Sequence, residues 1–131
     1  MSRSEPDVEA VKAANLRFYQ AFGSLDIAEM QQVWETSPRA MCLHPGWRLL
    51  TGWEEIRASW EGIFYNTSLM HFNITEIQAV VQEDSAWVFC VENVSSVTDG
   101  RATNFGIQAT NVFVRKDDGW RMVHHHASGA N

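Results

Sequence analysis

The spacing of the hydrophobic residues changes near residue 66, and this change constrains the fold more than any other feature of the chain. Before it, apolar residues recur every three or four positions, which predicts helices. After it, apolar and polar residues alternate, which predicts strands over 69–82, 86–97, 102–115 and 120–128. Asp99-Gly100 and Asp117-Asp118-Gly119 favour tight hairpins between the last three. We therefore expect an α+β protein with helices first and an antiparallel sheet second.

The first half predicts two helices before any strand. Ser4 is a suitable first cap, and Gly23 ends the apolar pattern that follows it. Asp26 is a second capping residue, with Glu29 three positions later. Pro38 lies beyond the end of this second helix, as is common after a helix terminus.

A short hairpin and a third helix are expected next. Residues 40–44 form an apolar strand pattern, and 48–50 can pair back on it. Thr51 and Glu54 have capping-box spacing, which predicts that the third helix begins at Thr51.

The predicted strands are long for so short a chain, so the sheet must twist and curl. In the first of them the apolar phase moves from Phe72 and Ile74 to Ile77 and Ala79. This shift predicts a β-bulge near Thr75–Glu76, which would bend the sheet.

Length and charge limit the possible classes of protein. From the length of 131 residues we expect a single domain, 1–131. The net charge is −6, and no cluster of Lys or Arg is present, which argues against nucleic-acid binding. No apolar segment is long enough for a membrane span or typical of a secretion signal, so we expect a cytoplasmic protein. Cys42 and Cys90 are expected to be buried, reduced thiols.

Several segments resemble the NTF2-like superfamily, in particular the SnoaL-like proteins and the association (hub) domain of calcium/calmodulin-dependent protein kinase II. The segments are Gly-Trp-Arg-Met-Val-His-His-His-Ala-Ser-Gly-Ala at 119–130, Val-Phe-Val-Arg at 112–115, and Leu-His-Pro-Gly at 43–46. The resemblance implies a cystatin-like cone, in which three N-terminal helices pack on a strongly curved, four- to six-stranded antiparallel sheet. It also implies a homodimer or larger ring, formed through the outer face of the sheet.

The same resemblance leaves three functions open, since one fold hosts many activities. They are a small-molecule-binding protein, an isomerase, cyclase or hydratase, and an oligomerisation hub. The hub domains line their cavity with arginines. When this sequence is aligned with them without gaps, Glu92 and Ala127 fall at two of the arginine positions, and only Arg101 lies near a third. We therefore expect a small apolar or weakly polar ligand, and we predict no cofactor.

Glu92 is the leading candidate for a catalytic residue. It interrupts an apolar row in which Val88, Cys90 and Val94 share one strand face. A carboxylate buried there would have a raised pKa and could act as a general base or acid. The alternative is a structural glutamate, either exposed or paired with Arg101 across the hairpin.

The triplet His124-His125-His126 has two faces. His124 and His126 share one face of the strand, where a third ligand such as His44 or His71 would complete a metal site. The favoured interpretation is that they are histidines at a sheet or subunit surface. We therefore predict no metal site. His125 shares the other face with Val123 and Ala127, and is a candidate catalytic partner of Glu92. Its alternative is a hydrogen-bonded core histidine.

The remaining candidates would line the cavity and bind the ligand, with His44 at its mouth. They are Tyr19, His44, Trp47, Trp60, Phe64, Arg101, Thr103 and Phe105. For the aromatic residues, ordinary core packing is the competing interpretation.

Overall fold

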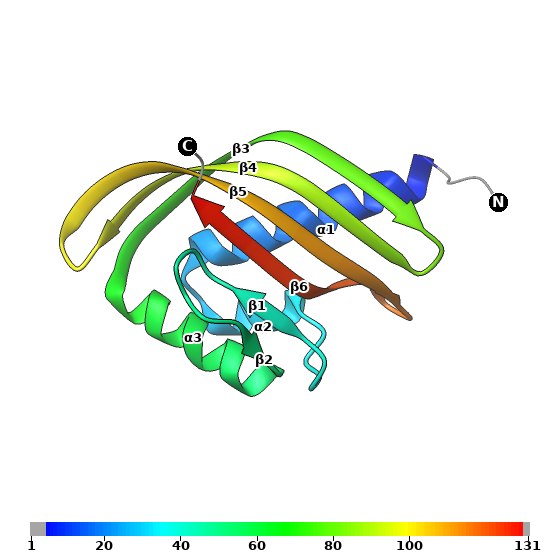
Figure 1. Cartoon of the computed structure of the whole chain (residues 1–131), viewed down its shortest axis with the longest axis horizontal. Coiled ribbons are helices and arrows are strands. Elements are labelled where there is room, and N and C mark those ends of the chain that lie inside the picture. Colours follow the sequence, from blue (N-terminus) through cyan, green and yellow to red (C-terminus); the bar gives the residue numbers. More distant parts are fainter. Residues whose placement is uncertain (1–4, 130–131) are drawn as a thin grey trace.

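The computed structural model describes residues 5–129, so the predicted cap at Ser4 lies outside the described residues. Three helices precede four long strands, with a small hairpin before the third helix (Figure 1). The elements are α1 Glu5–Ser24, α2 Ile27–Val33, β1 Met41–Leu43, β2 Leu50–Thr51, α3 Trp53–Asn66, β3 Thr67–Gln82, β4 Ser85–Thr98, β5 Arg101–Lys116 and β6 Gly119–Gly129. The predicted order of elements is confirmed, and the long strands extend at most two residues beyond their predicted ends.

The six strands form one sheet in the order β2-β1-β6-β5-β4-β3. The meander from β3 to β6 is antiparallel, as predicted. The pair β1–β6 is parallel, with Cys42 opposite His125. The sequence did not indicate this pair, because it joins segments more than 80 positions apart; it brings the loop after β1 against the middle of β6.

Three register shifts interrupt the sheet, and two of them bear on the predicted strands. The predicted bulge in β3 is confirmed by a register shift between Thr75 and Gln78, with Glu76 at a φ of 53°. A second shift lies between β5 and β6, where Val123 is the extra residue. Because of it, Met122 rather than Val123 is buried along with His125, which corrects the expectation that Val123 and His125 share a face.

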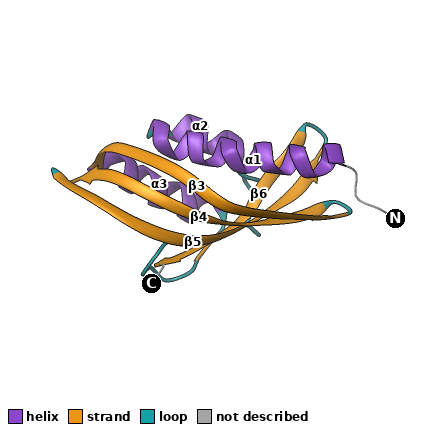
Figure 2. Ribbon diagram, turned by 90° about the horizontal axis from the view of Figure 1, so that it is seen from above, coloured by secondary structure: helices purple, strands orange, loops and turns teal. Residues whose placement is uncertain are grey.

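The helices pack on the concave face of the sheet, and Figure 2 shows α1 and α2 together on one side of β3, β4 and β5. The core lies between these layers and includes Phe18, Trp60, Phe113 and Met122, all without exposed surface. Within residues 5–129, no helix is both long enough and apolar enough to cross a membrane. Cys42 and Cys90 are buried and are not joined in a disulfide.

Helix starts follow the sequence only in part. The side chain of Asp26 accepts a hydrogen bond from the backbone N–H of Ala28, as expected of a cap for α2. The predicted capping box at Thr51 is wrong. α3 is capped by Gly52, whose φ of 85° favours glycine, and the backbone N–H of Thr51 donates to the Glu55 carboxylate instead.

Candidate functional site

A cavity of about 330 Å³ lies between the concave face of the sheet, α1, α3 and the loop after β1. Most of its wall is apolar. The lining residues are Phe22, His44, Pro45, Trp47, Ile63, Met70, Phe72, Glu92, Val94, Phe105, Ile107, His125 and Ala127. A largely apolar cavity with a few polar groups is typical of small-molecule sites.

The register of the sheet brings Glu92 and His125 to this cavity. Glu92 of β4 lies opposite Ile107 of β5, and His125 of β6 lies opposite Asn111, two alternations further along β5. Since alternate residues point to the same face, all four side chains share the concave face. Both candidate catalytic residues therefore line the cavity wall.

Glu92 is buried, with 3% of its surface exposed, and its Oε2 accepts a hydrogen bond of 2.6 Å from the Tyr19 hydroxyl. Desolvation raises the pKa of Glu92 from 4.5 to about 7, and the hydrogen bond from Tyr19 opposes this rise. Arg101 is exposed and forms no ion pair with Glu92, so the alternative of a structural pair is wrong. Near neutral pH, Glu92 can therefore either donate or accept a proton.

Tyr19 connects Glu92 to a buried amide. Its single proton is directed to Glu92, so its oxygen must accept the 3.2 Å hydrogen bond from Nδ2 of Asn111. The same Nδ2 donates to Oδ1 of Asn15 at 2.8 Å. These contacts fix the orientation of the Asn111 amide.

The orientation of Asn111 determines the tautomer of His125. Its Oδ1 lies 2.6 Å from Nδ1 of His125, so Nδ1 carries the proton and donates. Desolvation lowers the pKa of His125 well below its ordinary value, so the ring is neutral and Nε2 carries a lone pair. The ring packs against Phe18 with 4.8 Å between centroids, which holds it in place.

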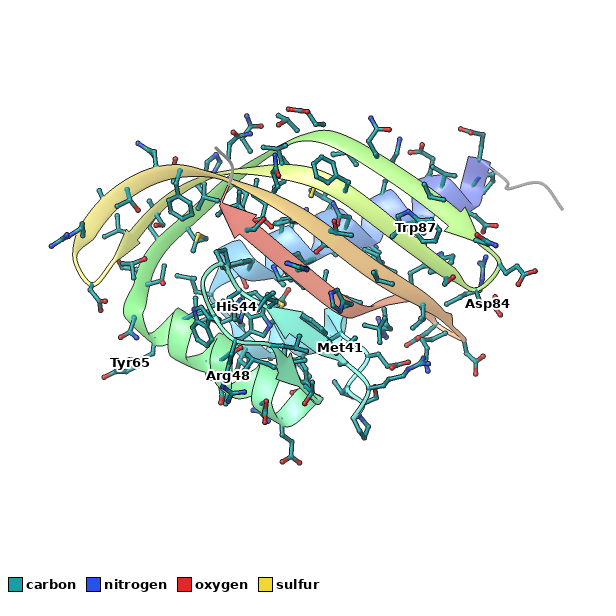
Figure 3. The ribbon with its side chains drawn as sticks, in the orientation of Figure 1. Met41, His44, Arg48, Tyr65, Asp84 and Trp87 are labelled. Atoms are coloured by element: carbon teal, nitrogen blue, oxygen red, sulfur yellow. The ribbon has the colours of Figure 1, made fainter. Side chains whose placement is uncertain are left out.

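His44 is the second neutral imidazole of the cavity. Ser59 directs its proton to the carbonyl of Ile56 at 2.6 Å, so its oxygen accepts from Nε2 of His44 at 2.9 Å. Burial lowers the pKa of His44 to about 4. Figure 3 shows the His44 side chain inside the fold, between α3 and β6, whereas Tyr65 extends outward from the end of α3.

The other predicted site residues divide into three groups. Trp47 and Phe105 line the cavity and are about half exposed, which places them at its mouth. Trp60 and Phe64 belong to the core behind the wall, which agrees with their alternative interpretation. Thr103 lines a neighbouring groove that Trp47 and Phe105 also border, and Arg101 lies exposed at the hairpin.

Sequence reasoning did not identify the two asparagines of the network. Asn111 interrupts the buried row of Ile107, Ala109 and Phe113 in the same way that Glu92 interrupts its own row. Asn15 lies on the buried face of α1 beside Ala14. A polar residue within an apolar row is the signal that would have found both.

His124 and His126 lie on the opposite face of β6 from His125, with 6.2 Å between their ring centroids. His44 approaches His125 instead, at 6.4 Å, and is separated from the other two by the sheet. Among the described residues, no group of three or more His, Cys, Asp or Glu side chains is placed to hold a metal ion.

Comparison with known proteins places this geometry in a family. The SnoaL-like domain family matches residues 11–131, and the chain belongs to that family. It is similar to a candidate dehydratase of the NTF2-like family from Streptomyces avermitilis, with 34% identity, a TM-score of 0.92, and coverage of 98% of this chain and 99% of that one. The expected cystatin-like, NTF2-like fold is thereby confirmed.

Two further relatives show how widely the domain is used. A candidate association domain of calcium/calmodulin-dependent protein kinase type II from Thiobacillus denitrificans is 32% identical, with a TM-score of 0.81 and coverage of 92% of this chain and 94% of that one. The F-box protein SKIP8 of Arabidopsis thaliana is 27% identical over 119 residues, which are 91% of this chain. The matched segment covers 49% of SKIP8, so this chain spans about half the length of that protein.

Proposed function

We propose that the cavity binds a small, largely apolar molecule, and that Glu92 and His125 remove water from it or add water to it. The observation that carries the proposal is a buried carboxyl group with a pKa near 7 in an otherwise apolar cavity. The similarity to a candidate dehydratase over nearly the whole chain supports this reaction class over the other acid–base reactions.

The two side chains have complementary roles, since Glu92 donates a proton and His125 accepts one. Protonated Glu92 donates its proton to the leaving hydroxyl of the substrate, which departs as water. The lone pair on Nε2 of His125 takes a proton from the neighbouring carbon, whose C–H electrons form the new double bond. Glu92 is then a carboxylate and His125 an imidazolium, and proton transfer between them, directly or through the released water, restores the starting state. Addition of water is the reverse.

A substitution at Glu92 tests the chemistry. Neutral cyclic β-hydroxy ketones are suitable first substrates, since loss of water gives a conjugated enone that absorbs in the ultraviolet. Glu92→Gln should lower turnover by about 10²–10⁴-fold and preserve binding, because the amide cannot transfer the proton. Glu54→Gln, on the exposed first turn of α3, is the matched control.

The results separate the candidate functions. Full turnover by Glu92→Gln would contradict the acid–base role. A wild-type protein that copurifies with a small molecule, seen by native mass spectrometry, but turns over no substrate would support the alternative of a binding protein.

We also propose that the chain dimerises through the outer face of its sheet. The support is apolar side chains on that face: Val80 of β3 and Trp87 of β4 lie opposite each other and are 44% and 40% exposed. The similarity to a candidate association domain is consistent with assembly through the sheet.

A further inference from the structure

We infer that the cavity selects neutral ligands that carry hydrogen-bond donors, such as ring compounds with two hydroxyl groups, and discriminates against carboxylates. The inference rests on the proposed function and deepens it, because it names the chemical class of the ligand. Its basis is the direction of each hydrogen bond around the cavity.

The first acceptor is Nε2 of His125. The proton of Tyr19 is directed to Glu92, so Asn111 must present its amide N–H to Tyr19 and its carbonyl to His125. The only ring proton of neutral His125 therefore lies on Nδ1 and is directed to Asn111. Nε2 has no hydrogen-bond partner among the described residues, and the cavity that His125 lines is the space available to it.

The second acceptor is Nδ1 of His44. The ring proton lies on Nε2, because Ser59 has already directed its own proton to the carbonyl of Ile56. The thiol of Cys42 lies 3.9 Å from Nδ1 and is a weak donor, so it does not saturate this nitrogen. The two lone pairs come from rings whose centroids are 6.4 Å apart, which suits two hydroxyl groups on one ring system.

The third polar group is Oε1 of Glu92, since Oε2 already accepts from Tyr19. It accepts a hydrogen bond when Glu92 is ionised and donates one when Glu92 is protonated. The remaining side-chain donor of the lining is the indole N–H of Trp47, at the mouth. Within residues 5–129, no Lys or Arg lines the cavity.

A carboxylate ligand would therefore meet two imidazole lone pairs and a carboxyl group, with no cation to compensate its lost hydration. A hydroxyl group meets the complementary acceptor instead. A cavity of about 330 Å³ lies near the lower end of the range for small-molecule sites, so a molecule of one or two rings is of suitable size.

A matched series of two-ring compounds tests the inference on the wild-type protein. Isothermal titration calorimetry at pH 8, where Glu92 is mainly ionised, would compare naphthalene, 2-naphthol, the dihydroxynaphthalene isomers and 2-naphthoate. We expect each well-placed hydroxyl to tighten binding by about three- to tenfold, so that the best diol binds about ten- to a hundredfold more tightly than naphthalene. The carboxylate should bind most weakly.

His44→Phe removes one acceptor and preserves a ring of similar size. In this variant the best diol should bind no more tightly than 2-naphthol binds to the wild-type protein, whereas the affinity for naphthalene should stay the same. His126→Phe makes the same substitution at an exposed position on the opposite face of β6, so it is the matched control and should leave the whole series unchanged.

Tighter binding of naphthoate than of naphthol, or equal affinities for naphthalene and every diol, would overturn the inference and leave cavity binding intact. Absence of binding by every compound would overturn cavity binding by ring molecules, and this inference with it. Loss of turnover in Glu92→Gln is measured separately, so the two proposals can fail independently.

Discussion

Nδ1 of His125 lies 2.6 Å from Oδ1 of Asn111, and through this contact the buried amide joins the two candidate catalytic side chains. Asn111 donates from its other end to Tyr19, whose hydroxyl donates to Glu92. The proton positions at the two ends of the chain are thus linked: the direction of the Tyr19 hydroxyl determines which nitrogen of His125 carries the lone pair. Asn111 is a positioning residue in this arrangement.

The network predicts the tautomer of His125. In ¹⁵N NMR spectra of the wild-type protein, Nδ1 of His125 should carry the proton and Nε2 should have the shift of an unprotonated nitrogen. Asn111→Leu removes the acceptor, so protonation at Nε2 should increase, and unfolding should require about 1–3 kcal/mol less because Tyr19 and His125 lose a partner. Asn104→Leu, on an exposed stretch of β5, should change neither. Protonation of the wild-type ring at Nε2 would contradict the assignment.

Glu92 should make the protein less stable as the pH rises. Its pKa is about 7 in the folded state against about 4.5 when unfolded, so the folded state binds the proton more tightly between these values. The stabilisation is complete below pH 4.5 and is lost as the pH rises to 7. Urea unfolding at pH 5 and pH 8 measures the free energy of unfolding of the wild-type protein and of Glu92→Gln. The value for the variant minus that for the wild type should increase by about 2–3 kcal/mol from pH 5 to pH 8.

Comparison with the variant is needed because His44 and His125 act in the opposite direction. Burial lowers the pKa of both rings, so the unfolded state binds their protons more tightly and stability falls as the pH drops below about 6.5. Both histidines are present in Glu92→Gln, so their effect cancels in the difference. A difference independent of pH would contradict the burial of Glu92.

A second charged cluster should stabilise the fold in the opposite pH range. Glu35 accepts two hydrogen bonds of 2.7 Å from Arg39 and one of 3.1 Å from Lys116. The hydrogen bonds from Arg39 are the main reason that the pKa of Glu35 falls to about 2. This stabilisation is present above about pH 4.5 and is lost as the pH falls toward 2.

Glu35→Gln should therefore lower the free energy of unfolding by about 1–2 kcal/mol at pH 7, and by less at pH 3. Urea denaturation at the two pH values measures the difference. Glu61→Gln removes an exposed ion pair with Arg57 and should cost less than about 0.5 kcal/mol at either pH. Equal costs for the two variants would show that the Glu35 cluster has no special role.

The outer face of the sheet makes a prediction about assembly. Trp87→Lys places a charge in the proposed dimer contact and should shift the protein from dimer to monomer in light scattering at micromolar concentration. Tyr65→Lys, at a side chain that is 90% exposed on α3, is the control and should leave the dimer intact. A wild-type protein that is monomeric under these conditions would contradict the proposal.

The fold could be predicted largely because its local signals agree with its topology. The two Asp-Gly turns fixed the ends of β4, β5 and β6 within one residue, and alternation revealed the bulge near Glu76. The parallel pair of β1 with β6 could not be predicted, since it depends on how the loop after β1 packs rather than on any local pattern. The extra residue at Val123 was also missed, because the apolar neighbour Met122 hides the change of phase.

The candidate site was predictable where a polar residue interrupts an apolar row. This signal identified Glu92 and would also have identified Asn111. Aromatic residues gave no such signal: Trp47 lines the cavity and Trp60 lies in the core, although both are tryptophans in the same part of the chain. Side-chain depth depends on the packing of α3 against the sheet, which the sequence does not report.

The pKa of Glu92 tests the central claim most directly. Titration of the ¹³C-labelled carboxyl group by NMR, assigned with Glu92→Gln, should give a pKa of about 7. The hydrogen bond from Tyr19 stabilises the ionised form of Glu92, so the pKa should rise further in Tyr19→Phe, where this bond is lost. Tyr65→Phe should leave the pKa unchanged. A carboxyl group that titrates near 4.5 and is insensitive to Tyr19 would show that Glu92 lies in water, and the proposed chemistry would have no basis.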